Sequence, residues 1–228
     1  MKKNNNNNNN NNGNGSHSWW ASLWGRSHGS DQQLAPYRRI AIQLHYDLPR
    51  PDSARSVLLV SPKTSACCAV GGLSLASCLA EEIRQPILLI DACPRGPQVS
   101  GLLQCATMKG FADLLSDPSL PLEELVLSTN HQNVKFLPAG TTTLQPAAPE
   151  AVKTLLKTAE ERYDFVLLSG GSLLNDSMAL ALAPCVGCVL LLAVENETMV
   201  EDLDAAQDAL SFCRTRKVGL VFATPARR

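Results

Sequence analysis

The sequence lacks a strong net charge, a long hydrophobic run and an apolar segment near its start. Its formal net charge is −1 over 228 residues, so there is no electrostatic reason to expect binding to nucleic acid or to an anionic membrane. The longest apolar run, residues 186–194, is too short to cross a bilayer. No apolar stretch follows Lys2 and Lys3, so we expect no signal peptide and a cytoplasmic chain.

The sequence also lacks the cysteine pattern of a secreted disulfide scaffold, because its eight cysteines are scattered through apolar runs. We therefore expect free thiols. Cys185 and Cys188 have C-x-x-C spacing, and Cys67 and Cys68 are adjacent, which leaves a zinc, iron–sulfur or redox site as an alternative to core packing. We favour packing and expect no metal, because no second C-x-x-C lies at a suitable distance and cysteine is a common small core residue.

The chain divides into a tail, residues 1–33, and a domain, residues 34–228. The tail is rich in Asn, Gly, Ser and His, and such a segment buries too little apolar surface to offset its ordering entropy. Its exception is SWWASLW, which contains Trp19, Trp20 and Trp24 close to one helical face. Two interpretations of this segment stay open: a docking peptide for a partner or membrane interface, and a short helix that packs on its own domain.

The domain alternates short apolar runs with helical patterns, which predicts an α/β fold with a mostly parallel sheet and helices on both faces. The predicted strands are SVLLVS, PILLID, VKFLP, DFVLLS, GCVLLLAV and KVGLVFA; the predicted helices span residues 72–83, 110–115, 122–127, 149–162, 177–182 and 199–213. Ligands of such sheets bind beyond the carboxyl ends of the strands, so we expect chemistry at residues 61–69, 91–95 and 169–172.

Five segments in order resemble the cytoplasmic domain of the bacterial tyrosine kinases of capsule and exopolysaccharide synthesis, a branch of the MinD/ParA-like P-loop ATPases. They are PYRRIAIQL, LLIDACPRGP, GFADLLSDPSLPLEEL, NVKFLPAGTTTLQPAAPEAVKTLL and ERYDFVLLSGGSL. The resemblance covers residues 35–223. It implies a P-loop NTPase fold, with ATP and Mg²⁺ as the cofactors of an active relative.

The resemblance also implies where a phosphate-binding Walker A loop would lie, in SPKTSACCAV. Such a loop needs glycines for close backbone approach, a lysine for the phosphates and a hydroxyl for Mg²⁺. In this chain Ser65 and Cys67 occupy the glycine positions, Cys68 the lysine position and Ala69 the hydroxyl position. The only nearby lysine, Lys63, precedes the loop.

The other two motifs that the resemblance locates are altered as well. The second Walker motif, D-x-D-x-R in the family, reads Asp91, Cys93 and Arg95, and the metal-side aspartate of Walker B is Ser169. Mg²⁺ prefers oxygen ligands, and phosphoryl transfer depends on charge neutralisation by lysine and metal. We therefore predict no catalytic residues, no bound cofactor and no metal, and treat Asp91 and Arg95 as remnants. Asp91 is expected to accept backbone hydrogen bonds or to pair with Arg95.

The altered motifs predict a non-catalytic relative of these kinases, and the resemblance implies a role in exopolysaccharide or capsule assembly or export. The resemblance implies that its partner is a membrane polysaccharide co-polymerase or a kinase paralogue, and that it reaches the inner face of the cell membrane through that partner. The family's E-x-x-R-x-x-R assembly helix reads Ala35, Arg38 and Ala41, which puts homo-oligomer formation in doubt. The alternatives are an active tyrosine kinase or ATPase with an atypical site, and a MinD-like or pilus-assembly positioning protein.

Overall fold

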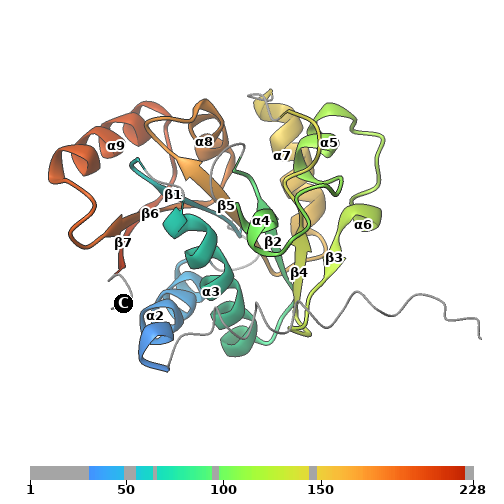
Figure 1. The fold of residues 1–228 in the computed structure, drawn as a ribbon, viewed down its shortest axis with the longest axis horizontal. Helices are drawn as coiled ribbons and strands as arrows, with labels where there is room; N and C mark the ends of the chain where they lie inside the picture. The colour runs from blue at the N-terminus through green and yellow to red at the C-terminus, as the bar shows by residue number, and fades with distance from the viewer. Residues whose placement is uncertain (1–30, 49–54, 64–65, 94–97, 144–147, 224–228) are drawn as a thin grey trace, which may run out of the picture.

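The computed structural model describes residues 31–48, 55–63, 66–93, 98–143 and 148–223 (Figure 1). The tryptophan segment of the tail lies outside these residues. The described residues contain a seven-stranded sheet in the order β3-β4-β2-β5-β1-β6-β7. The strands are β1 (Ser56–Ser61), β2 (Ile87–Asp91), β3 (Leu127–Ser128), β4 (Val134–Leu137), β5 (Phe165–Ser172), β6 (Cys188–Val194) and β7 (Val218–Ala223).

Neighbouring strands of this sheet run parallel, except that the short strand β3 runs antiparallel to β4. The connections between parallel strands run through helices, as expected for crossovers of this kind. The helices are α2 (Asp31–Asp47), α3 (Ala66–Ile83), α4 (Val99–Leu102), α5 (Phe111–Ser116), α6 (Leu122–Leu125), α7 (Pro149–Glu160), α8 (Ser177–Leu182) and α9 (Val200–Phe212), with a 3-10 turn at Ala183–Cys185.

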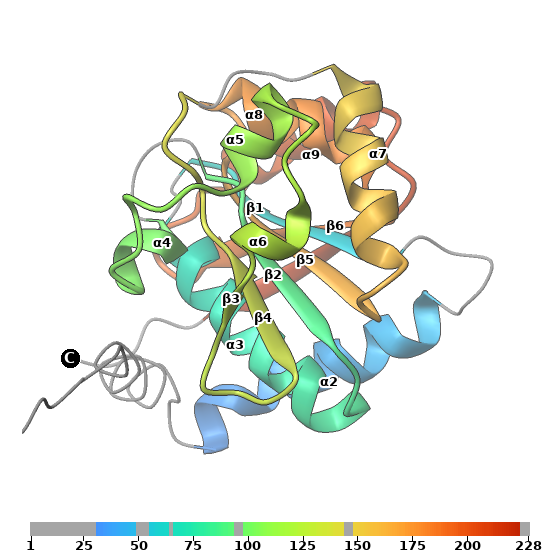
Figure 2. The ribbon, with the colours of Figure 1, turned by 90° about the vertical axis from the view of Figure 1, so that its right-hand side faces the viewer.

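The helices cover both faces of the sheet and bury a separate core on each (Figure 1). Helices α2 and α3 lie on one face, and α7, α8 and α9 lie on the other; Figure 2 shows both layers from the β3 end of the sheet, with α5 and α6 beside that end. Successive strand residues face opposite layers, so Leu58 packs with the α7–α9 layer and Leu59 with the α2–α3 layer. This arrangement confirms the predicted fold class.

Every predicted strand and helix is present, with changes at the ends. Helix α3 begins at Ala66, six residues before the predicted start at residue 72, and α2 begins at Asp31, inside the segment assigned to the tail. The predicted helix at residues 122–127 ends at Leu125 and is followed by β3. Two short elements, α4 and β3, are too brief to give a periodic signal. Among the described residues, no helix is long and apolar enough to pass through a membrane.

Candidate functional site

The carboxyl ends of β1, β2 and β5 meet at one edge, because β5 lies between the other two strands. Asp91 pairs with Ser169 in the register of β2 and β5, and Ser61 pairs with Ser172 in that of β1 and β5. The fold therefore brings together Asp91 and Ser169, which lie far apart in the sequence. Helix α3 begins just beyond β1, so its first turn lies at the same edge.

The first turn of α3 holds three of the four positions aligned with the Walker A loop. Cys68 and Ala69 are buried, and Cys67 is partly buried against the core on the α2–α3 side. The neighbouring Cys67 side chain and burial both raise the pKa of the Cys68 thiol, so this thiol is neutral at pH 7. The turn therefore presents small uncharged side chains where a phosphate contact calls for a cation. Ser65, the fourth position, lies outside the described residues.

Ser169, at the Walker B position, joins β5 to α3. Its hydroxyl donates a hydrogen bond of 3.1 Å to the carbonyl oxygen of Cys68. The helix backbone lies close by, since a Cβ atom added at Gly72 would lie 3.3 Å from the Cβ of Ser169. The hydroxyl thus makes a neutral, buried link between sheet and helix.

Asp91 is buried at the end of β2, and both of its carboxylate oxygens accept hydrogen bonds from the chain. The backbone N–H and the hydroxyl of Ser100 donate to Oδ2 at 2.7 and 2.6 Å, and the Cys93 N–H donates to Oδ1 at 3.2 Å. Burial raises the pKa of Asp91, and these hydrogen bonds oppose that rise. The Ser100 hydroxyl also accepts from the Ala139 N–H at 2.9 Å.

Asp91 consequently fastens α4 and the segment after β4 to the end of β2. This geometry favours the predicted role as an acceptor of backbone hydrogen bonds over a role as a metal ligand. The other expected partner, Arg95, lies outside the described residues. Cys93, which takes the place of the second carboxylate, is buried beside Asp91.

Lys63, the lysine nearest to the altered loop, points toward α9. Its Nζ lies 2.6 Å from a carboxylate oxygen of Asp202, which is largely buried. The backbone carbonyl of Lys63 also accepts a hydrogen bond from the Asn175 side chain at 3.3 Å. An ion pair with Asp202 competes with any phosphate for this lysine.

Arg38 is the one residue of the family's assembly motif that the chain keeps, and it pairs within the chain. Its guanidinium lies 3.5 Å from Glu81 and 3.8 Å from Glu82, both on α3. Ala41, on the same helix α2, is fully buried. The other two positions of that motif, Ala35 and Ala41, carry no charge.

The cysteines are all free thiols. Burial raises the pKa of Cys188 to about 11 and also raises the pKa of Cys185, so both members of the C-x-x-C pair are protonated at neutral pH. In the part of the chain that the structure describes, no group of three or more His, Cys, Asp and Glu side chains is placed to hold a metal ion.

Asp113 joins two segments of the family resemblance, GFADLL and LPAGTTT, through hydrogen bonds. Its carboxylate accepts five hydrogen bonds: one from the N–H of Gly110, and one each from the N–H and the hydroxyl of Thr141 and Thr142. Gly110 is required by close approach, because a Cβ atom there would lie 2.0 Å from the Pro138 oxygen. Burial alone would raise the pKa of Asp113, but the hydrogen bonds hold it well below its ordinary value.

We predict that Asp113→Asn destabilises the fold by about 2–3 kcal/mol at pH 7, since several donors lose a charged acceptor. A depressed pKa contributes stability that is present above the unfolded value of about 3.9 and is lost as the pH falls through the folded value. Urea unfolding should therefore give a difference in the free energy of unfolding between wild type and variant that is smaller near pH 3 than at pH 7. Asp117→Asn, an exposed aspartate just beyond α5, is the matched control. If that difference in free energy of unfolding is the same at both pH values, the role of Asp113 as a charged hydrogen-bond acceptor is wrong.

The sequence predicts the strand ends that form the site and most of the residues there, but it does not predict the roles of Ser100 and Asp202. Both are polar residues whose importance depends on a partner distant in the sequence, Asp91 for Ser100 and Lys63 for Asp202. A single sequence contains no signal for such pairs. Asp113 lay within a recognised segment, yet its five hydrogen bonds could not be read from that segment alone.

The chain matches no protein-family model and no curated protein sequence. Solved structures do resemble it. The kinase domain of the Escherichia coli tyrosine kinase ETK has a TM-score of 0.74 at 17% identity, over 92% of this chain and 82% of that one. The BceF tyrosine kinase domain has a TM-score of 0.72 at 20% identity, over 92% and 90%. The kinase domain of VpsO has a TM-score of 0.70 at 22% identity, over 86% and 97%.

A MinD cell division protein from Aquifex aeolicus is also similar, with a TM-score of 0.57 at 14% identity over 74% of this chain and 68% of that one. Its similarity is weaker and covers less of both chains than that of the three kinase domains. The chain therefore has the fold of the bacterial tyrosine kinase domains, within the broader MinD/ParA-like P-loop architecture.

Proposed function

We propose that the chain is a non-catalytic protein with a bacterial tyrosine kinase fold that takes part in the assembly or export of an exopolysaccharide or capsule. Its role is to bind a partner: the cytoplasmic part of a membrane co-polymerase that controls chain length, or a catalytically competent kinase paralogue. Through this partner the chain reaches the inner face of the cell membrane. The fold likeness and the segment resemblance support this pathway, and the residues of the site support the absence of chemistry.

The proposal rests on the side chains at the carboxyl ends of β1, β2 and β5, which are neutral or already hydrogen-bonded within the chain. A neutral buried Cys68 stands where a lysine would neutralise phosphate charge, and the Ser169 hydroxyl is bonded to the backbone of α3. Asp91, the remaining carboxylate, accepts three hydrogen bonds from its own chain. Phosphoryl transfer is achieved almost wholly by positioning and by neutralising charge, and these residues offer neither to a triphosphate.

An active kinase or ATPase with an atypical site is the less favoured alternative. It would depend on Lys63, Asp91 and Arg95, and Lys63 is paired with Asp202 while Asp91 is buried among its donors. A MinD-like or pilus-assembly positioning role remains a second alternative. It is favoured only by the MinD-like architecture, for which the similarity is lower than for the kinase domains.

We expect MgATP at millimolar concentration to leave the melting temperature of the full chain unchanged. A ligand that binds only the folded state must raise stability by about 1.4 kcal/mol at ten times its Kd, which a thermal shift assay detects easily. Mg²⁺ alone and MgADP serve as controls for ionic effects. A rise with MgATP that Mg²⁺ alone does not produce would overturn the non-catalytic assignment.

A further inference from the structure

Strand β7 ends the sheet, and no described residue pairs with its outer edge. Natural proteins usually guard such an edge with lysine, proline, charged side chains or a bulge. The stretch VGLVFA that forms β7 contains no charged residue and no proline. The outward N–H and C=O groups of β7 have no strand partner among the described residues, so they can pair with another strand.

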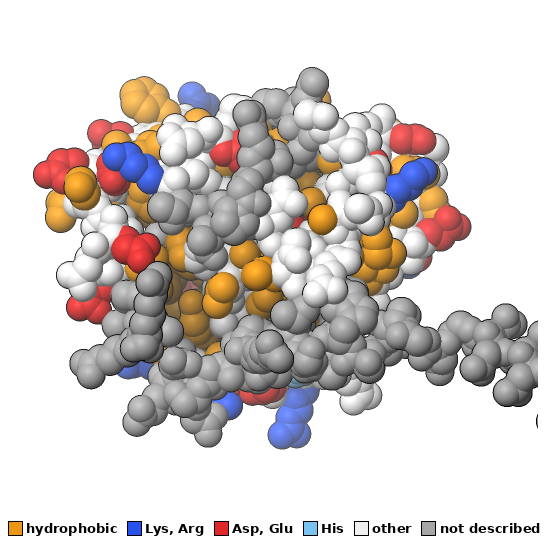
Figure 3. All heavy atoms as spheres, in the orientation of Figure 1, with side chains coloured by type: hydrophobic (Ala, Val, Ile, Leu, Met, Phe, Trp, Pro, Cys, Tyr) orange, Lys and Arg blue, Asp and Glu red, His pale blue; other side chains and the backbone are white. Residues whose placement is uncertain are grey.

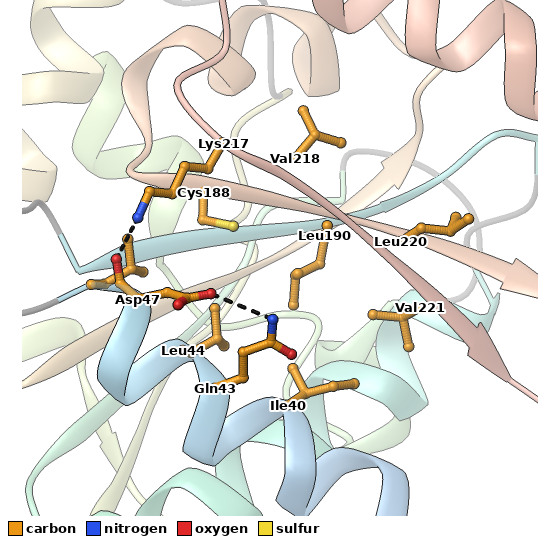
Figure 4. A pocket seen from close by; sticks show the side chains of 12 residues that line it. Ile40, Gln43, Leu44, Asp47, Cys188, Leu190, Lys217, Val218, Leu220 and Val221 are labelled. Atoms are coloured by element: carbon orange, nitrogen blue, oxygen red, sulfur yellow. Dashed lines mark hydrogen bonds between the residues drawn. The ribbon is translucent and has the colours of Figure 1, made fainter.

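One face of β7 is an exposed apolar row. Val218, Leu220 and Phe222 alternate along the strand and are 48%, 50% and 66% exposed. Figure 4 shows Val218 and Leu220 directed away from α2, whereas Val221 points toward it. Hydrophobic side chains also reach the surface over the neighbouring helix α9, at the left of Figure 3. An apolar row on an open edge is a feature that a monomer in water rarely keeps uncovered.

The opposite face of β7 borders a groove of about 360 Å³ between this strand and α2 (Figure 4). Its floor is apolar, with Ile40 and Leu44 from α2 facing Leu190 and Val221 from the sheet. The edge of β7 is thus flanked by apolar surface on both faces of the sheet.

We propose that β7 is a self-association edge, where a second copy of this chain adds its own β7 in antiparallel, two-fold pairing. Residues that lie opposite in an antiparallel pair point to the same face, so the two-fold axis must pass at a residue and not between two. We place it at Leu220, in the middle of the exposed row. In the register centred on Leu220, Leu220 meets Leu220 of the second copy, and Val218 meets Phe222. The second copy thereby gives each residue of the apolar row an apolar cross-strand neighbour and provides partners for the outward backbone groups of β7.

Among the described residues, the charges at the two ends of β7 fit this symmetry. Arg216 and Lys217 lie directly before the strand, and both are exposed. At the other end, Glu195 and Glu197 are exposed, and the Glu195 N–H bonds to the Ala223 carbonyl at 2.9 Å. Antiparallel pairing places the basic end of each strand beside the acidic end of the other, twice per dimer. A parallel arrangement would bring like charges together.

The ends of α9 support the same partner. Phe212, which is 90% exposed, ends α9 near the start of β7, and Met199 precedes α9 near the end of β7. The two-fold operation brings Phe212 toward Met199 of the second copy. A surface that is complementary to itself in charge and in apolar residues is the signature of an isologous interface. This edge is distinct from α2, whose altered assembly motif left oligomer formation in doubt, and the proposal does not depend on whether the chain binds nucleotide.

The proposal is tested by sedimentation equilibrium of the full chain over a concentration series. The wild type should form a reversible dimer, and Leu220→Lys should weaken it by about 100-fold or more, because two lysines then meet at the axis in an apolar interface. Met108→Lys, at an exposed apolar position in the segment between α4 and α5, should leave the dimer unchanged. Circular dichroism confirms that each variant is folded. A wild type that stays monomeric, or dimers that tolerate Leu220→Lys, would overturn the proposal.

A charge exchange tests the antiparallel register separately. Arg216→Glu and Glu195→Lys should each weaken the dimer by about tenfold, because each creates two like-charge contacts. The two changes combined in one chain restore opposite charges, so the affinity should return toward that of the wild type. If the combined variant is weaker than either single variant, the two ends do not meet and the antiparallel pairing is wrong.

Discussion

Arg55→Ala is expected to destabilise the fold by about 3–5 kcal/mol, the usual effect of removing one partner of a buried ion pair. Arg55 is buried just before β1 and pairs with Asp164, which lies just before β5. The same guanidinium donates to the Leu48 carbonyl at 2.7 Å and lies 4.8 Å from the centre of the Phe165 ring. Alanine would leave a largely buried carboxylate and a backbone carbonyl without this cation.

Thermal unfolding should show this loss as a fall of about 6–20 °C in Tm for a domain of this size. Lys153→Ala is the matched control, since the exposed pair of Lys153 with Glu150 should contribute no more than about 0.5 kcal/mol. Arg55→Met combined with Asp164→Leu should recover much of the stability, because the double change also removes the carboxylate that has lost this cation. A loss below about 1 kcal/mol for Arg55→Ala would show that the pair is well hydrated.

Arg55 also marks the limit of what the sequence predicts about the fold. The apolar runs predict the strands because strands buried on both faces need continuous hydrophobic residues, and β1, β2, β4, β5 and β6 fit that pattern. Arg55 belongs to no periodic pattern, so the sequence alone does not reveal that its ion pair with Asp164 links the starts of β1 and β5. Strand β7 shows a second limit: its apolar run predicts burial, yet alternate residues are exposed because it lies at the edge.

The sequence predicts where the candidate site lies in the fold, but it predicts few of the side-chain contacts within it. The strand-end rule and the motif order placed Asp91, Cys68 and Ser169 at one edge, and the sheet brings them there. The sequence did not reveal that Ser100 would engage Asp91 or that Asp202 would pair with Lys63. Such contacts depend on the exact approach of segments that are remote in the chain.

Restoring the four Walker A positions together, as Ser65→Gly, Cys67→Gly, Cys68→Lys and Ala69→Thr, is expected to create weak nucleotide binding without turnover. The glycines free the backbone to approach phosphates, and the lysine supplies the missing charge. Position 68 is fully buried, so the lysine should lower the stability of the ligand-free variant. MgATP at ten times its Kd should then raise stability by about 1.4 kcal/mol, which corresponds to about 3–6 °C in Tm.

Comparison of the variant with and without MgATP isolates binding from the change in intrinsic stability. The matched control carries three of the changes and keeps Cys68, and its Tm should not respond to MgATP, because the charge for the phosphates is still missing. Hydrolysis should remain at background in both variants. Cys93 and Ser169 still stand at two positions where the resemblance implies carboxylates for metal and water, so the metal would lack these oxygen ligands. Clear ATP hydrolysis by the four-site variant would contradict this prediction. It would show that the missing carboxylates at Cys93 and Ser169 matter less for turnover than the missing lysine at position 68.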